Sequence, residues 1–434
     1  MSEPEVVKRL VLCLDGTWNT DDGEAVSNIV HIRNNVLPVD TEKNVRQIVY
    51  YDTGVGTGLG LDRVFGGGLG LGLGENVRQA YRFLSGHFEE EVVSPAEGGR
   101  VGVAKTTEIY VFGFSRGAYT ARALAGYLGA AGLLKPEHCD AETEQAAWAI
   151  YRTKPHDRYP SERRKLADKV FRHVRIRCLG VFDTVGALGV PIERFRRFNR
   201  HRYEFHDTEL GSNVDVALHA LGLDEKRWPF RAAIWSRPNH EGNERVEQVW
   251  FPGVHTNIGG GYPDERISQL TLHWMMSRLP RPGLKLRPDT ISGEMLRELA
   301  RGTIYESRRI PLYLSDLLRP AFRKVANIGA NGTARVRAVG LPPHGLVHNE
   351  YIHWSALVRW HAPRSESGGE AYRPPNLSAV FDRLSQTYLQ QKSHSVAPAA
   401  PELRMVGLSG EVLDPENPEH AEEVNSLLMI AREP

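Results

Sequence analysis

Residues 111–122 read VFGFSRGAYTAR, a stretch that contains Gly-x-Ser-x-Gly with Ser115 at its centre. The apolar run 108–112 is typical of a strand, and the Ala- and Leu-rich run 116–131 is typical of a helix. A strand, a sharp turn and a helix in this order form a nucleophile elbow, in which Gly113 and Gly117 permit close packing. The stretch therefore predicts an α/β fold that presents the Ser115 hydroxyl above a sheet.

Working outward, strand-like and helix-like runs alternate along much of the chain. We expect strands at 9–14, 47–51, 108–112, 174–182 and 246–251, and helices at 28–36, 75–88, 116–131, 213–222 and 267–278. Alternation of this kind predicts a mostly parallel sheet with helices on both faces. Ligands bind such sheets at the carboxyl ends of the strands, so chemistry is expected where strands end.

The alternation weakens after about residue 285, and two later segments are rich in Gly, Ser, Pro and Ala. We therefore expect one α/β domain over residues 1–360 and a peripheral C-terminal extension over 361–434. The domain is expected to carry a Gly-rich loop at 54–74 and a basic-aromatic insertion at 190–210. The Gly-rich loop contains no G-x-G-x-x-G, which disfavours nucleotide binding, and we expect a loop at the pocket edge.

Composition excludes several classes of protein. The formal net charge is +1, which gives no electrostatic argument for a nucleic-acid partner. The three cysteines are far apart, so neither a disulfide framework nor a cysteine zinc site is expected, and Cys13 and Cys178 look like strand core residues. The histidines lack metal-ligand spacing, and we expect no metal and no cofactor.

The first residues, MSEPE, are acidic and lack the features of a signal peptide, which predicts synthesis in the cytoplasm. The apolar stretch 123–134 is shorter than the roughly 20 residues that span a bilayer. Membrane contact is therefore expected to be peripheral.

A serine nucleophile needs a histidine base and an acid that orients it. Asp183 closes the expected strand 174–182, and an aspartate at that place can reach behind a histidine; the alternative is a turn or helix cap. His255 follows the expected strand 246–251 and precedes three consecutive glycines. The order Ser, Asp, His is that of α/β-hydrolases. Asp264 is the alternative acid.

Acyl transfer also needs donors for the developing oxyanion. The backbone N–H of Arg116, which follows the serine, is the expected first donor. The turn after the first strand is the expected source of a second donor, through the amides of Gly16 and Thr17. Asp15 is expected to cap or brace that turn.

Several segments together resemble one family, the α/β-hydrolase-like family that includes type VI secretion phospholipase effectors of the first lipase group. The similar blocks are LDGTWN at 14–19, YDTGVGT at 51–57, GFSRGAYTAR at 113–122, GVFDTVGA at 180–187, HALGLDE at 219–225 and the segment 250–262. The resemblance covers roughly residues 9–360. One departure is Asn257, which stands where the family block tends to carry an acidic residue.

The resemblance implies a serine hydrolase with Ser115 as nucleophile, His255 as base and Asp183 as acid. It also implies an ester or phospholipid substrate, export by a specialised secretion system, and a secretion-apparatus or immunity protein as partner. A catalytically silent binding or assembly module that keeps the fold is the alternative, because fold does not determine function.

Arginines and aromatic residues alternate within 194–203. Arginines pair with phosphates while aromatic rings enter an interface, so Arg194–Tyr203 is a hypothesis for peripheral membrane contact. A solvated helix face with inward aromatic rings is the alternative.

Overall fold

The computed structural model describes residues 5–16, 25–54, 69–93, 102–153, 158, 160–171, 174–185, 210–227, 230–235, 242–288, 291–307, 322–323, 325, 349–363, 371–392, 404–407, 410–414 and 417–430. The insertion 190–210, with the segment Arg194–Tyr203, lies outside these residues except for Leu210. Thr17 lies outside them too.

The strands are β1 (Glu5–Leu14), β2 (Val39–Asp40), β3 (Val45–Asp52), β4 (Glu90–Val93), β5 (Gly102–Phe114), β6 (Leu133–Leu134), β7 (Val170–Phe171), β8 (Ile176–Phe182), β9 (Val214–Gly222), β10 (Arg245–Phe251), β11 (Glu350–His353) and β12 (Arg404–Val406). The helices are α1 (Asn28–Asn35), α3 (Leu69–His87), α4 (Arg116–Ala131), α5 (Ala141–Arg152), α6 (Pro160–Lys165), α9 (His255–Gly259), α10 (Arg266–Ser277), α11 (Gly293–Ala300), α13 (Ser355–His361), α14 (Pro375–Lys392) and α15 (Ala421–Ile430). Pro136–His138 and Pro418–His420, both among the described residues, form short 3₁₀ helices.

One large sheet organises the described residues, in the order β12-β11-β10-β9-β8-β5-β1-β3-β2. The pairs from β12 to β3 are parallel, whereas β2 pairs with β3 and β4 with β5 in antiparallel fashion. The fold is therefore the predicted α/β class with a mostly parallel sheet.

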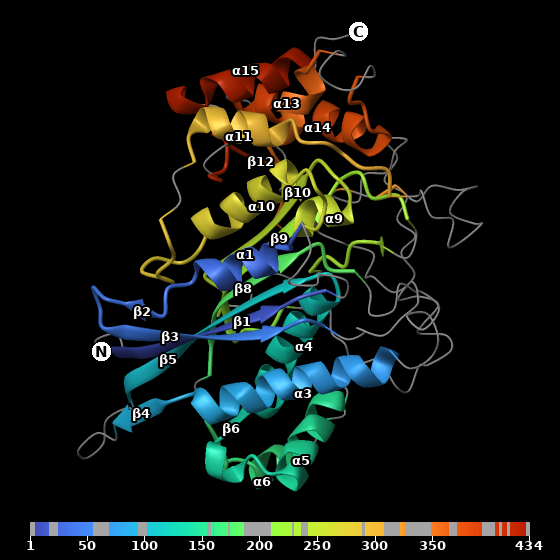
Figure 1. The fold of residues 1–434 in the computed structure, drawn as a ribbon. Coiled ribbons are helices and arrows are strands. Elements are labelled where there is room, and N and C mark those ends of the chain that lie inside the picture. Colours follow the sequence, from blue (N-terminus) through green and yellow to red (C-terminus); the bar gives the residue numbers. More distant parts are fainter. Residues whose placement is uncertain are drawn as a thin grey trace.

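Alternate side chains of the sheet face two different helix layers. On β1, Leu10, Leu12 and Leu14 pack with α3, α4 and α5, whereas Val11 and Cys13 pack with α1, α10 and α11. Figure 1 shows these two groups of helices on opposite sides of the strands. Coverage of both faces explains why β1 buries apolar side chains on either side of the sheet.

The expected helix at 213–222 is wrong, because these residues form strand β9, in which every residue is buried. β9 lies between β8 and β10 and is covered on both faces, so it is buried along its whole length. Its residues are mostly apolar, with Asp215 and His219 among them, and they lack the two-residue alternation of a half-buried strand. A buried run of this kind cannot be distinguished from a helix by periodicity alone.

The Gly-rich segment 54–74 is helical at its end, since α3 begins at Leu69. The expected loop therefore stops at residue 68, and residues 55–68 lie outside the described part of the chain. None of the described helices has both the length and the apolar character that crossing a bilayer requires.

The C-terminal residues contribute to the same sheet through β11 and the edge strand β12. Their helices α13, α14 and α15 enclose a third apolar cluster with Trp250 and Ile352. Figure 1 shows these helices together at one end of the molecule. The division of the chain at residue 360 stays a prediction.

Cys13 and Cys178 are buried strand residues of the core, as expected, and all three cysteines are free thiols. Burial raises the pKa of the Cys178 thiol to about 12. A thiol held protonated in an apolar core packs as a small hydrophobic side chain.

The turn between β5 and α4 is built by close backbone contacts. A Cβ at Gly117 would lie 2.0 Å from the carbonyl oxygen of Leu14, and a Cβ at Gly113 would lie 2.5 Å from the carbonyl oxygen of Gly117. Both obstacles are backbone atoms, which cannot move aside as a flexible side chain can. Only glycine lets α4 start directly against the end of β1.

We predict that Gly117→Ala costs about 3 kcal/mol or more of unfolding free energy, because the added methyl overlaps the backbone of β1. Gly86→Ala is the matched control: a Cβ added at this exposed glycine of α3 would meet nothing within 4 Å. It should gain about 0.5–1 kcal/mol from reduced chain entropy. Urea unfolding of the two variants measures both values, and equal effects would contradict the close-packing argument.

Two buried histidines are held neutral by the fold. Burial lowers the pKa of His219 on β9 to about 3 and that of His353 on β11 to about 3, from an ordinary value of 6.5. The Nε2 atom of His219 accepts a hydrogen bond from the Thr184 amide at 3.2 Å, which requires an unprotonated nitrogen.

We predict that stability falls as the pH is lowered from about 6.5 towards 3. In that range the unfolded state binds a proton at these two histidines and the folded state does not, so each contributes a slope of up to about 1.4 kcal/mol per pH unit. His219→Gln keeps a neutral acceptor for Thr184 and should flatten the decline. Unfolding curves of wild type and variant at pH 7, 6 and 5 test this, and parallel pH dependences would refute it.

Candidate active site

Ser115 occupies a strained turn at the carboxyl end of β5. Its backbone has φ 57° and ψ −116°, and its N–H donates to the Phe182 carbonyl at the end of β8, at 3.2 Å. A positive φ is uncommon for a residue other than glycine and marks stored strain. This geometry is that of the predicted nucleophile elbow.

The structure brings Ser115, His255 and Asp183 into one hydrogen-bonded chain. His255 Nε2 lies 2.8 Å from Ser115 Oγ, and His255 Nδ1 lies 2.7 Å from Asp183 Oδ2. An ionised carboxylate only accepts hydrogen bonds, so Nδ1 carries the proton and Nε2 is left to accept from the serine hydroxyl. These atoms come from loops after β5, β10 and β8, at the edge of the sheet where the strands end.

Asp183 is fully buried and also pairs with Arg323. Arg323 Nη1 donates to Oδ1 at 2.6 Å and Nη2 donates to Oδ2 at 2.9 Å, while the Gly222 amide donates to Oδ1 at 2.9 Å. Burial opposes ionisation of Asp183, but the charge of Arg323 and the hydrogen bonds from His255 and Arg323 hold its pKa well below the usual range. The carboxylate therefore stays ionised beside the histidine.

The imidazole of His255 is enclosed by two aromatic rings. Phe114 lies 4.9 Å from it between ring centroids, and Phe230 meets it edge-on at 5.0 Å. Burial lowers the pKa of His255 below its ordinary value, although the hydrogen bond to Asp183 acts in the opposite direction. At neutral pH the ring is consequently uncharged and able to accept a proton.

Glu225 and Arg227 hold the backbone at His255, where the segment that follows β10 enters helix α9; residues 252–255 are called the histidine loop below. The His255 amide donates to Glu225 Oε2 at 3.3 Å, and Arg227 binds both carboxylate oxygens of Glu225. Burial opposes ionisation of Glu225, but Arg227 outweighs it and lowers the pKa of that carboxyl group. Arg227 also stacks on Phe230 at 3.6 Å from the ring centroid, so the same group supports a wall of the site.

The predicted oxyanion donors lie close to the nucleophile where the structure describes them. A Cβ at Gly16 would come within 3.1 Å of Ser115 Cβ, so this residue lies directly against the serine. The Gly16 amide, however, donates to the Asp15 carboxylate at 2.7 Å, and Ser27 Oγ donates to the same carboxylate at 2.5 Å. Asp15 thus braces the turn. Arg116 is the first residue of α4, where helical amides lack an intrahelical acceptor.

Asp264, the alternative acid, does not contact His255. Its carboxylate pairs with Arg266 at 2.7 Å and accepts from the Thr303 amide at 2.8 Å. Asn257, two residues after the histidine, donates to the Thr303 carbonyl at 2.9 Å and accepts from the Val254 amide at 3.2 Å. An ionised acidic side chain cannot make the first of these bonds, so the amide is suited to this loop.

Sequence reasoning missed Arg323, Glu225, Arg227 and Phe230. Glu225 is the last residue of the block at 219–225, and this block could have indicated a role for Glu225. Arg323 belongs to no motif. In the described part of the chain no cluster of three or more His, Cys, Asp or Glu side chains is arranged to hold a metal ion.

Comparisons with known proteins indicate a family for this chain. The family model for the catalytic domain of Tle1-like phospholipase effectors of the type VI secretion system matches residues 8–278. A curated relative, Uncharacterized protein YEL023C of Saccharomyces cerevisiae, is 30% identical over 248 residues, which are 52% of this chain and 32% of that protein. The chain therefore spans about a third of the length of this relative.

Two solved structures are similar at lower levels. The Tle1 effector bound to the VgrG spike of the type VI secretion system has 20% identity and a TM-score of 0.35, over 60% of this chain and 52% of the other. An uncharacterized protein from Pseudomonas aeruginosa has 16% identity and a TM-score of 0.39, over 98% of this chain and 62% of the other.

The family match covers more than half of the chain and includes the elbow, the segment with Asp183 and the loop with His255. The chain belongs to the family of Tle1-like catalytic domains of type VI secretion phospholipase effectors.

Proposed function

We propose that the chain is a serine hydrolase that cleaves carboxylic esters, phospholipids among them, through Ser115, His255 and Asp183. The observation that supports the proposal is the continuous hydrogen-bond chain among the three side chains, with distances of 2.8 and 2.7 Å. Such a chain lets a histidine act as a general base towards a serine hydroxyl.

In the first half-reaction His255 Nε2 takes the hydroxyl proton while Ser115 Oγ attacks the ester carbonyl. The imidazolium that forms is stabilised by the ionised Asp183. Collapse of the tetrahedral intermediate expels the alcohol, which receives the proton from His255 and leaves an acyl group on Ser115. Water activated by His255 then attacks the acyl-enzyme and releases the carboxylic acid.

The developing oxyanion needs N–H donors placed before the reaction begins. The Arg116 amide is the proposed first donor, because it lies at the start of α4 directly after the serine. Gly16 and Thr17 stay proposals for the second donor. The Gly16 amide would have to turn from the Asp15 carboxylate or be shared with it.

Arg323 is proposed as a positioning residue. Its two-pronged pair with Asp183 fixes the carboxylate in the orientation that meets His255 Nδ1, and its charge keeps the carboxylate ionised. We expect the same charge to lower the affinity of His255 for a proton, because a nearby cation disfavours the imidazolium. Arg323 therefore tunes the base as well as holding the acid.

Phospholipid as substrate, export by a specialised secretion system, and a secretion-apparatus or immunity protein as partner are proposals that rest on membership of the family. Synthesis in the cytoplasm stays a prediction from the sequence. Peripheral membrane contact through Arg194–Tyr203 is a proposal of the same kind, supported by the sequence alone.

A fluorophosphonate probe should label Ser115, located by mass spectrometry of the adduct. Ser115→Ala should abolish labelling and lower ester turnover by roughly 10³-fold or more, and His255→Ala should lower both strongly because the serine loses its base. His87→Ala, at an exposed histidine that ends α3, is the control and should label as wild type does. Unchanged turnover in Ser115→Ala would overturn Ser115 as the nucleophile. Folded wild type that neither labels nor hydrolyses esters would favour the catalytically silent module.

We predict a pH profile of kcat/KM that rises through the pKa of His255, below about 6.5, and then levels off, because only the neutral ring accepts the serine proton. Arg323→Gln should move this rise to higher pH, since removal of a nearby cation makes protonation of His255 easier. It should also destabilise the fold by about 3–5 kcal/mol.

Arg323→Lys is the matched variant, because it keeps the charge and loses the two-pronged geometry. Its pH profile should return towards that of wild type while kcat stays lowered. A purely structural role for Arg323 predicts lower activity in both variants with the pH profile unmoved, and that result would overturn the proposed tuning.

A further inference from the structure

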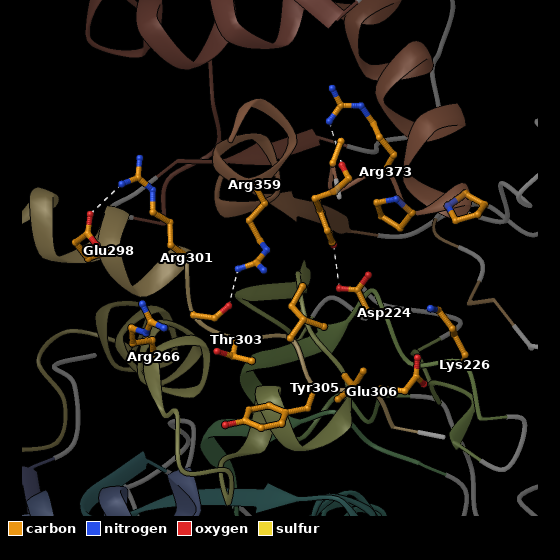
Figure 2. A pocket seen from close by; sticks show the side chains of 17 residues that line it. Asp224, Lys226, Arg266, Glu298, Arg301, Thr303, Tyr305, Glu306, Arg359 and Arg373 are labelled. Carbon is orange, nitrogen blue, oxygen red and sulfur yellow. Dashed lines mark hydrogen bonds and ion pairs between the residues drawn. The ribbon is translucent and has the colours of Figure 1, made fainter. Parts of the chain in front are cut away.

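A cavity of about 830 Å³ lies beside the histidine loop, and nothing proposed above uses it. Its wall includes Val254 but none of Ser115, Asp183 or His255. The wall is formed by residues of the segment 301–306 and of 371–375, together with side chains from α10, α11 and α13. Cavities of this volume accept organic molecules larger than a simple ion. Figure 2 shows the lining side chains converging from these segments.

Basic side chains dominate the charge of the lining. Five of them contribute to it, namely Lys226, Arg266, Arg301, Arg359 and Arg373, against the three acids Asp224, Glu298 and Glu306. The difference, five minus three, is an excess of two positive charges. Arg266 and Arg301 have ion-pair partners in Asp264 and Glu298.

Among the basic residues that line the cavity, Arg359 is the one that we expect to bind an anion. Its Nη1 atom donates to the carbonyl oxygens of Ala300 and Gly302 at 2.9 and 2.7 Å. Its Nε atom is buried without a hydrogen-bond partner, and no carboxylate forms an ion pair with it, within the part of the chain that the structure describes. A buried guanidinium N–H without an acceptor is costly. In Figure 2, Arg359 is drawn in the middle of the lining residues.

The remaining wall suits an organic group attached to an anion. The ring of Tyr372 lies 5.4 Å from the Arg359 guanidinium carbon, and Tyr305, which is stacked on Tyr262, supplies a second aromatic side chain. Arginine presents planar pairs of donors that match the oxygens of phosphate. The positive excess of the lining favours an anionic ligand.

We propose that this cavity binds the phosphate group of a phosphate ester, with Arg359 and Arg301 as ligands and the organic part against Tyr305 and Tyr372. The site is distinct from Ser115 and does not depend on catalysis. A lipid headgroup and a soluble phosphate ester share this chemistry.

Isothermal titration calorimetry of the full chain at low salt tests the proposal, with glycerol 3-phosphate, inorganic phosphate, and short-chain phosphatidic acid below its micellar concentration as ligands. Arg301→Gln should weaken binding by about threefold or more, and Arg359→Gln by about tenfold. Arg297→Gln is the matched control: Arg297 lies one helical turn before Arg301, is similarly exposed, pairs with Glu422 and does not line the cavity. Ser115→Ala should bind as wild type does.

Arg359→Gln also removes two bonds to backbone carbonyls, so its melting curve is recorded first. If it does not fold, the proposal is tested with Arg301→Gln and Lys226→Gln, both of which should weaken binding of the phosphate esters. Equal affinity for the soluble ester and the lipid supports a phosphate site for soluble esters, and tighter binding of the lipid supports a headgroup site. The absence of saturable binding by all three ligands overturns the proposal, as does equal weakening by Arg297→Gln and Arg301→Gln.

Discussion

The carboxylate of Asp183 has no exposed surface, and it accepts hydrogen bonds from His255, Arg323 and the Gly222 amide. A buried charge is tolerated only when it is paired and its lone pairs are occupied. Here the pairing joins the loops after β8 and β10, the end of β9, and a residue beyond the matched catalytic segment 8–278. Ionisation of Asp183 therefore depends on the correct assembly of these segments.

The sheet supplies the geometry that this pairing requires. In the order β5, β8, β9, β10, the serine, the aspartate, the Gly222 amide and the histidine follow four neighbouring parallel strands. Their carboxyl ends meet along one edge. The glycines at 113 and 117 let α4 begin against β1, and the strain stored at Ser115 is supported by this packing and by its bond to Phe182. The positions of the Ser115, Asp183 and His255 side chains therefore follow from where the strands place their backbone.

Patterns local in sequence predicted the elbow, the α/β class, most strand and helix positions and the three residues that the structure joins. The failure at 213–222 arose because a strand buried on both faces carries no alternation, so its periodicity resembles that of a buried helix. The Gly-rich segment was predicted as a loop to its end, but α3 runs through several of its glycines, although glycine disfavours a helix. Arg323 gave no signal, since a lone arginine outside a motif is indistinguishable from a surface residue until its partner is placed.

By itself, the sequence determined which residues could carry the chemistry, because the elbow motif, the strand-ending aspartate and the glycine-flanked histidine are local features with local physical causes. Only the tertiary structure decided that Asp183 rather than Asp264 meets His255, that Arg323 neutralises it, and that Arg301 and Arg359 share a cavity. These are contacts between residues up to about 140 positions apart, as between Asp183 and Arg323. Whether two such distant charges pair depends on the order of the strands in the sheet. Patterns local in the sequence do not determine that order.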